Sequence, residues 1–166
     1  MMSLEDLIGN FIWITMKIRS EDMDRISKTD YYLNIAMQAA KRSTCLRRMY
    51  GCVIVNNDEI ISTGYNGSAR GEANCCDIYE VCPRAHKEHN TGDYSDCPAV
   101  HAEQNAMLSA SRENMLGATL YLAGYEVNED GTVKPMEECY PCPICARMIK
   151  NSGILEVIGP QDRKGV

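Results

Sequence analysis

Two short motifs, H-A-E at His101 and P-C-P-I-C at Cys142, constrain the fold of this chain more than any other feature. His101, Cys142 and Cys145 offer one imidazole and two thiols, which are ligand types that suit Zn²⁺. Three protein ligands leave the fourth tetrahedral position of zinc open for water, as in catalytic rather than closed structural sites. The fold must therefore bring two distant segments together, with Glu103 beside them as an acid/base.

Each motif is predicted to lie at the beginning of a helix. The apolar and small residues 99–108 predict a helix that begins near Pro98, and Pro141 is expected to open a second helix over residues 142–150. The two cysteines of the second motif are three residues apart, so they share one helix face. Two helix N-termini directed at one metal would also stabilise thiolates, because the aligned peptide dipoles favour negative charge there.

Either motif alone is weak support for a zinc site. H-x-E is common by chance, and C-x-x-C also occurs in redox pairs and in structural zinc sites. Together, in this order and with a proline before the first cysteine, they match the H-x-E…P-C-x-x-C signature of zinc nucleobase deaminases. Cys139, Cys142 and Cys145 form overlapping C-x-x-C pairs. Pro141 favours the second pair and leaves Cys139 unassigned.

The composition favours one compact domain in a reducing compartment. A chain of 166 residues with 45% hydrophobic residues can bury one core, and we expect a single catalytic domain over residues 29–166 after an extension at residues 1–28. Nine cysteines, an odd number, favour metal binding in the cytoplasm over a disulfide scaffold. The apolar stretch at residues 11–18 is too short to span a bilayer, so no membrane association is predicted.

The charge balance limits the partners that this chain is expected to bind. A net charge of −6 argues against a nucleic-acid surface, because binding to a phosphate backbone needs many basic side chains. Two or three cations suffice to bind the phosphate of a small nucleotide. Arg42 is a candidate for that role, as are Arg47, Arg48 and Arg70. For any one of them, a solvated surface charge is the alternative.

The order of elements predicts an α/β fold. We expect a helix over residues 31–43, capped at Thr29-Asp30, and a hairpin over residues 51–67 that turns at Asn57-Asp58. Two further strands are expected over residues 118–124 and 154–159. Residues 66–98 lack periodicity, so a second metal would be needed to organise them. Residues 125–138 form a polar insertion in which a small hairpin is one interpretation. The alternation of strands and helices favours parallel pairing with right-handed crossovers, in a sandwich of helices and sheet.

From about residue 31 to residue 159 the chain resembles the deoxycytidylate (dCMP) deaminases of the cytidine deaminase superfamily. The resemblance rests on R-S-T-C-L-R-R, I-I-S-T-G-Y-N-G, N-C-C-D, H-A-E-Q-N-A-M and P-C-P-I-C. It implies a cytidine deaminase-like, three-layer α-β-α sandwich with a mixed sheet. The last strand of many relatives is in doubt, because only seven residues follow Gly159. The polar insertion also departs from the family pattern and is expected near the mouth of the active site.

The same resemblance implies zinc-dependent hydrolysis of dCMP to dUMP and ammonia, which would supply dUMP for thymidylate synthesis. Zinc would lower the pKa of a water that attacks C4 of cytosine, while Glu103 shuttles protons. By resemblance, the backbone of Ala102 would bind the cytosine carbonyl oxygen. Asn66 would contact the sugar or the base edge, with a turn residue of positive φ as the alternative. The resemblance also implies a homo-oligomer, often a hexamer, regulated by dCTP and dTTP.

A second, structural zinc is a further expectation from the resemblance, because four other cysteines lie where relatives with two zinc ions carry ligands. Four thiolates would close a tetrahedral site and fix the long loop. His86 or His89 could replace one of them. The alternative is that these cysteines are buried and unliganded, since free cysteine packs as a small hydrophobic residue. The four residues are Cys45, Cys75, Cys82 and Cys97.

Three other functions stay open at this point. Deamination of cytidine, deoxycytidine or dCTP would use the same chemistry, and arginines facing the pocket would favour a monophosphate over a nucleoside. An editing deaminase acting on tRNA or DNA is disfavoured by the net charge. A non-catalytic zinc module or a nucleotide sensor is disfavoured by Glu103, because structural zinc needs no neighbouring carboxylate that is not a ligand.

Overall fold

The computed structural model describes residues 25–88, 91 and 95–163. The expectations for the apolar stretch at residues 11–18 and for His89 fall outside these residues. Within the described part of the chain, no helix is both long and apolar enough to cross a membrane.

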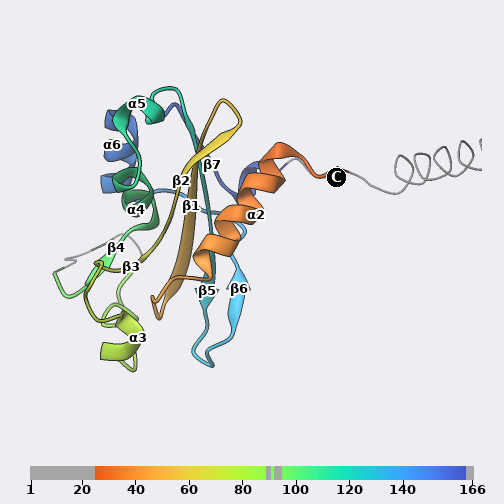
Figure 1. The fold of residues 1–166 in the computed structure, drawn as a ribbon. Helices are drawn as coiled ribbons and strands as arrows, with labels where there is room; N and C mark the ends of the chain where they lie inside the picture. Colours follow the sequence, from red (N-terminus) through yellow and green to blue (C-terminus); the bar gives the residue numbers. More distant parts are fainter. Residues whose placement is uncertain (1–24, 89–90, 92–94, 164–166) are drawn as a thin grey trace, which may run out of the picture.

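A mixed five-stranded sheet lies at the centre of the molecule (Figure 1). Strand β1 pairs antiparallel with β2 on one side and with β5 on the other. The other edge of β5 is shared by two short strands, β7 at its beginning in parallel and β6 at its end in antiparallel orientation. The strands are β1 (Arg48–Asn56), β2 (Glu59–Tyr65), β5 (Thr119–Val127), β6 (Val133–Pro135) and β7 (Glu156–Ile158).

The hairpin between β1 and β2 turns where the sequence predicts it. Asn57 and Asp58 both have positive φ, 50° and 68°, as a two-residue type I′ turn requires. The turn is also fixed to helix α2 (Lys28–Ala40), because Asp58 accepts hydrogen bonds from Lys28 Nζ at 2.6 Å and from Tyr32 Oη at 2.7 Å. The cap of α2 is Ser27, two residues before the predicted Thr29-Asp30, because its side chain accepts the Asp30 N–H.

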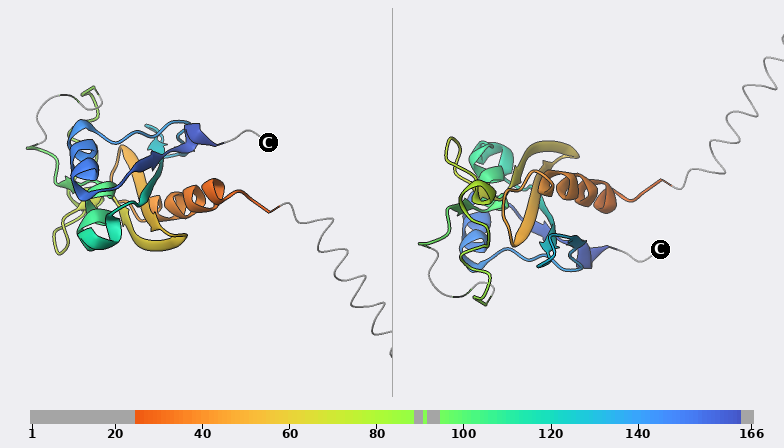
Figure 2. Two further views of the ribbon diagram at one scale, coloured as in Figure 1. Left: turned by 90° about the horizontal axis from the view of Figure 1, so that it is seen from above. Right: turned by 90° about the horizontal axis from the view of Figure 1, so that it is seen from below.

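Helices cover both faces of the sheet and give the predicted three layers. Helix α2 packs on one face, while α4 (Ala102–Leu108), α5 (Arg112–Met115) and α6 (Pro143–Ser152) lie on the other (Figure 1). Views from above and below show the same separation (Figure 2). The three-layer sandwich with a mixed sheet, predicted by resemblance, is thus the observed architecture.

Side chains of β1 alternate between two cores, one on each face of the sheet. Cys52 and Ile54 are buried in the core below α4 and α6, whereas Val53 and Val55 are buried against α2. Because successive residues of a strand point to opposite faces, a strand covered on both sides is continuously apolar. This explains the run C-V-I-V in the sequence.

The strand pairing follows the sequence-based expectation in part. The hairpin of β1 and β2 is antiparallel as predicted, and β5 and β7 pair in parallel across helix α6. The strands on either side of α4 were also expected to pair in parallel, yet β5 pairs with β1 instead of β2. The other pairs are antiparallel, because the tight hairpin reverses the chain and β5 joins the free edge of β1. In the described chain a short 3₁₀ turn (Pro160–Asp162) follows β7.

The segment expected to be a long loop, residues 66–98, contains two short elements and is closed by a third. Strand β3 (Gly67–Ser68) and helix α3 (Cys75–Ile78) lie within it, and β3 pairs antiparallel with β4 (Ala99–Val100), which follows it directly. The helix predicted from residue 99 therefore begins only at Ala102, since residues 99 and 100 are used in the pairing with β3. The polar insertion forms the small hairpin of β5 and β6.

Candidate active site

The first candidate metal ligand of each motif is the N-cap of a helix. His101 caps α4, and its backbone N–H donates to Gln104 Oε1 at 3.0 Å. Cys142 caps α6, and its sulfur accepts the Cys145 N–H at 3.4 Å. Pro143 occupies the first turn of α6, where a missing N–H costs nothing. The opening proline is thus Pro143 rather than Pro141.

These two helix ends bring three potential metal ligands together. His101 Nδ1 lies 3.5 Å from Cys142 Sγ and 3.4 Å from Cys145 Sγ. A tetrahedral zinc, with Zn–N of about 2.05 Å and Zn–S of about 2.3 Å, separates the nitrogen from each sulfur by about 3.6 Å. The observed distances therefore fit zinc. Within the described residues, no other group of three or more His, Cys, Asp and Glu ligand atoms lies within 4.8 Å of one another.

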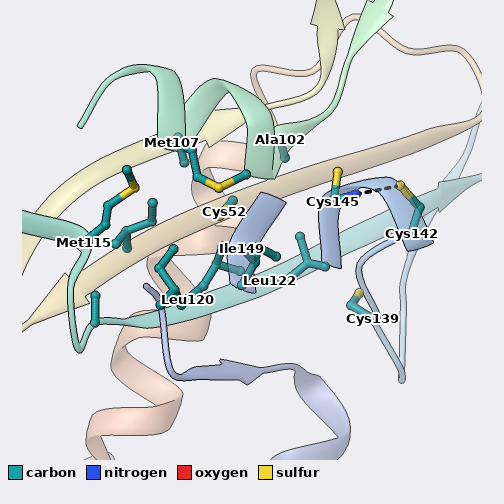
Figure 3. Packing of buried hydrophobic residues seen from close by; sticks show 14 residues of the cluster. Cys52, Ala102, Met107, Met115, Leu120, Leu122, Cys139, Cys142, Cys145 and Ile149 are labelled. Carbon is teal, nitrogen blue, oxygen red and sulfur yellow. Dashed lines mark hydrogen bonds between the residues drawn. The ribbon is translucent and has the colours of Figure 1, made fainter. Parts of the chain in front are cut away.

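The two cysteines of this group are buried in the core (Figure 3). Burial raises the pKa of the Cys145 thiol, and the neighbouring Glu103 carboxylate raises it further. Ionised thiols in this position need a compensating positive charge nearby. A bound divalent cation supplies that charge, so the donor set and its surroundings suit zinc.

Glu103 lies two residues after the histidine, in the first turn of α4, and its side chain is only 5% exposed. Burial raises the pKa of this carboxyl, because removal from water disfavours the charged form; hydrogen bonding to its backbone and the nearby His101 oppose the shift. Burial raises the pKa of the Cys52 and Cys139 thiols, and the charge of the nearby Glu103 raises the pKa of both further. The carboxyl thus lies at the inner end of the site, beside the candidate ligands.

A pocket opens onto this group and extends towards several basic side chains. His101, Ala102, Glu103 and Cys142 line its inner end. The remaining polar and aromatic lining comes from strand β1 and the residue before it, from the segment after β2, from the loop before β4 and from the segment before α6. These side chains are Arg47, Arg48, Tyr50, Asn66, Arg84 and Tyr140.

The arginines of the pocket are only partly those expected. Arg42 is exposed and is not among the lining residues, and Arg70 is exposed and donates to Ser109 Oγ at 3.1 Å. Arg47 and Arg48 line the pocket, as does Arg84, which the sequence did not single out. Arg84 is only 4% exposed, and a buried arginine in an aperiodic loop leaves no pattern by which sequence analysis could find it.

Hydrogen bonds hold two of these arginines in place. The Arg47 guanidinium donates to the backbone carbonyls of Arg84 at 2.8 Å and Lys87 at 2.6 Å, which fastens the loop over β1. Arg48 pairs with Glu126, directly opposite on β5, at 2.9 Å. The pocket therefore carries a fixed cluster of positive charge within an acidic protein.

Asn66 lines the pocket and ties together the segments around it. Its Oδ1 accepts the Ser43 hydroxyl and the Tyr50 N–H, both at 2.7 Å, and its Nδ2 donates to the Arg48 carbonyl at 2.8 Å. The alternative turn role is wrong, because among the described non-glycine residues only Asn57 and Asp58 have positive φ. Asn66 holds β1 in position and still faces the pocket.

The four cysteines of the expected second zinc site lie in one region. After burial, the thiols of Cys45, Cys97 and Cys82 contribute to the raised pKa of Cys75, so each of the three lies near Cys75. These three cysteines also line the pocket. Their sulfurs are not gathered as tightly as the first ligand group. Cys76 and His86 are exposed. Cys52 is fully buried in the core, where it packs as a small hydrophobic residue.

The family model of the cytidine and deoxycytidylate deaminase zinc-binding region matches residues 26–159. The chain belongs to this family. Its members include a protein of Mycobacterium phage D29 named deoxycytidylate deaminase, which is 38% identical over 146 residues, covering 84% of this chain and 99% of the phage protein.

Other relatives in the family agree. A deoxycytidylate deaminase of Schizosaccharomyces pombe is 38% identical over 136 residues, and the match covers 81% of this chain but 37% of the yeast protein. Among solved structures, the dCMP deaminase of cyanophage S-TIM5 in complex with dCMP and dUMP superposes with a TM-score of 0.56 at 25% identity, covering 81% of this chain and 83% of that one. The resemblance seen in the sequence motifs is confirmed.

Proposed function

We propose that this protein hydrolyses dCMP to dUMP and ammonia, and so supplies dUMP for thymidylate synthesis. The observation that carries this proposal is one pocket lined by Glu103, by His101 and Cys142 of the three-ligand metal group, and by three arginines. Such a pocket matches the two ends of a cytosine nucleotide, a base and a phosphate. The D29 relative, which the match covers over 99% of its length, bears the name of this activity.

His101, Cys142 and Cys145 would hold a catalytic zinc. Zinc, when bound, supplies Lewis acidity that makes water reactive near neutral pH. Three protein ligands would leave zinc one position for water, and the pocket reaches this group because His101 and Cys142 both line it. Because both ligands are helix N-caps, the positive ends of α4 and α6 also favour the charged thiolates.

Glu103 would act as the proton shuttle. As a base it takes the two protons of the attacking water in turn, and as an acid it delivers one to ring N3 and the other to the departing amine. Its burial keeps competing bulk water away from the carboxyl. The backbone of Ala102, at the first position of α4, would donate to the cytosine carbonyl oxygen, because the first N–H groups of a helix have no partner within it.

Arg47, Arg48 and Arg84 would bind the 5′-phosphate, in place of the exposed Arg42. Guanidinium groups match phosphate oxygens in geometry and stay charged at all relevant pH values. Three of them in the pocket offset the repulsion that a net charge of −6 exerts on a dianion. Asn66 would orient the sugar through the pocket wall that it holds. The positive charge of the three arginines favours dCMP over cytidine and deoxycytidine, which carry no phosphate.

We further propose a second, structural zinc held by Cys45, Cys75, Cys82 and Cys97, and a cytoplasmic homo-oligomer, such as a hexamer, controlled by dCTP and dTTP. The nearness of the other three thiols to that of Cys75 supports the metal site. Zinc analysis of fully active protein should give two ions per chain, and one ion per chain would remove the second site. Light scattering and dCMP turnover with added dCTP or dTTP test the assembly and its control.

The test of the main proposal is ammonia release from the zinc-loaded protein with dCMP, dCTP, deoxycytidine, cytidine and CMP side by side. We expect turnover of dCMP well above the others. Glu103→Gln should abolish turnover while it retains zinc, since Glu103 is not a ligand, and His101→Ala should lose the catalytic metal. Loss of zinc in the Glu103 variant would overturn its role, and preference for a nucleoside would overturn the phosphate site.

A further inference from the structure

Tyr140 is an exposed aromatic residue at the pocket for which the mechanism above has no use. Its side chain lines the pocket, yet 59% of the residue is exposed, so it lies at the mouth rather than at the inner end. A large ring left partly in water next to a binding site loses little on being covered by a ligand, and it gains by burying its face. Tyr140 is therefore placed to contact whatever occupies the pocket.

The backbone on both sides of Tyr140 is fixed. On one side the Cys139 N–H donates to Gln161 Oε1 at 3.1 Å, and the Gln161 amide donates back to the Cys139 carbonyl at 3.4 Å. On the other side are Pro141, whose ring fixes φ, and the N-cap Cys142. Cys139 itself is 1% exposed and anchors the segment in the core (Figure 3). The ring is thus presented on a rigid support.

The support extends into the turn that follows β7. Gly159 donates its N–H to Asp162 Oδ2 at 2.8 Å, and the same oxygen accepts the Gln161 amide at 3.2 Å. A Cβ atom at Gly159 would overlap the Gln161 side chain and lie 2.7 Å from the Cys139 carbonyl. The close approach of this turn to the segment before α6 therefore requires glycine, and it brings Gln161 within reach of Cys139.

The position of Tyr140 selects the part of the substrate that it would meet. Tyr140 is two residues from Cys142, so their Cα atoms are at most about 7 Å apart. The reacting carbon of the base must lie near Cys142 and Glu103, which line the same pocket as Tyr140. A flat aromatic ring beside the reacting end fits the face of a pyrimidine rather than a phosphate.

We propose that Tyr140 covers the face of the pyrimidine ring at the mouth of the pocket, and that Gln161 is a positioning residue that holds it there. The inference rests on the proposed function, because it takes a cytosine nucleotide as the ligand. It adds a base-recognising residue and its support to a site otherwise built from metal ligands, an acid/base and arginines. Both residues lie outside the motifs H-A-E and P-C-x-x-C.

The experiment compares Tyr140→Ala, Tyr140→Leu and Tyr140→Phe with the wild-type protein, in dCMP turnover and in calorimetric binding of the product dUMP. Loss of stacking should raise KM and the dUMP Kd by roughly ten- to hundredfold in the Ala and Leu variants. The change in kcat should be much smaller, because stacking stabilises bound substrate and transition state alike. Tyr140→Phe keeps the ring and should restore most of the affinity.

Tyr31→Ala is the matched control, because Tyr31 is 48% exposed and lies on α2, across the sheet from the pocket. It should leave KM and Kd at wild-type values. A merely structural role of Tyr140 would instead lower the melting temperature and kcat with KM unchanged. That result, or equal KM values in the Ala variant and the wild type, would overturn the inference alone.

A double-mutant cycle tests the role of Gln161. Gln161→Ala should raise KM less than Tyr140→Ala does, with unchanged zinc content, and it should add nothing when Tyr140 is already alanine. Additive effects of the two substitutions would show that Gln161 does not act through Tyr140 and would overturn its assignment. A wild-type protein that neither converts dCMP nor binds dUMP would overturn the proposed function, and this inference with it.

Discussion

At the scale of single residues, the environment of Glu103 decides how the site would work. The carboxyl is almost completely buried, and its pKa is raised by that burial. A carboxyl with a raised pKa is a stronger base when ionised and a more available proton donor afterwards, so it suits a shuttle that must do both near neutral pH. An exposed glutamate at the same position would keep its ordinary pKa of about 4.3.

This leads to a prediction for the pH profile of dCMP turnover. Because the raised pKa means that the proton is bound at higher pH, the base form of Glu103 is lost as the pH falls through that value. The acidic limb of kcat/KM should therefore lie above the pKa of about 4.3 of a solvated glutamate. Zinc content measured at each pH separates this effect from loss of metal. An acidic limb at or below pH 4.3, with zinc retained, would contradict the prediction.

At the scale of elements, two glycines let helices approach the sheet on its opposite faces. A Cβ atom at Gly64 of β2 would overlap the backbone of Ala102 and Ala106 in α4. A Cβ atom at Gly51 of β1 would overlap Ala36 and Ala40 of α2 in the same way. Neither glycine has positive φ, so their role is close packing rather than turn geometry.

The two glycines form a matched pair for mutation. Gly64→Ala and Gly51→Ala should each destabilise the fold by about 2 kcal/mol, since overpacking against a backbone forces the helix away. Only Gly64→Ala should also lower kcat strongly, because α4 carries Glu103 and is capped by His101. Urea unfolding and dCMP turnover of both variants provide the measurement. Equal losses of kcat in the two variants would show that the position of α4 is not what the activity depends on.

At the scale of the whole molecule, the candidate metal site is part of the core rather than an attachment to it. Cys142 and Cys145 belong to the same buried cluster as Leu120, Leu122 and Ile149, so α6 is held to the sheet by the residues that would bind zinc (Figure 3). Metal binding and folding are coupled in such an arrangement, since the ligands converge only in the folded chain.

Removal of zinc should therefore lower the melting temperature. A ligand present at a hundredfold excess over its Kd stabilises the folded state by about 2.7 kcal/mol, which corresponds to roughly 5–10 °C for a chain of this size. Calorimetry before and after chelation measures the shift, and His101→Ala should show a smaller one because its catalytic site is already weakened. An unchanged melting temperature after complete removal of metal would contradict the coupling.

What the sequence alone determined was the chemistry of the site and the local structure that carries it. The type and spacing of His101, Glu103, Cys142 and Cys145 predicted one three-ligand group, because ligand preference and helix N-caps are local properties. The turn at Asn57-Asp58 was predicted for the same reason. The start of α4 was missed by a few residues, because residues 99 and 100, which a helix would also accept, pair with β3 instead.

Only the tertiary structure decided which side chains share the pocket with that group. The burial of Arg84, the exposure of Arg42, the antiparallel placement of β5 beside β1 and the contact of Gln161 with Cys139 all join segments distant in the sequence. Such contacts depend on how whole faces pack, and packing depends on the sum of many weak interactions rather than on any motif. The reacting end of the site is therefore encoded locally, whereas its specificity arises from the fold.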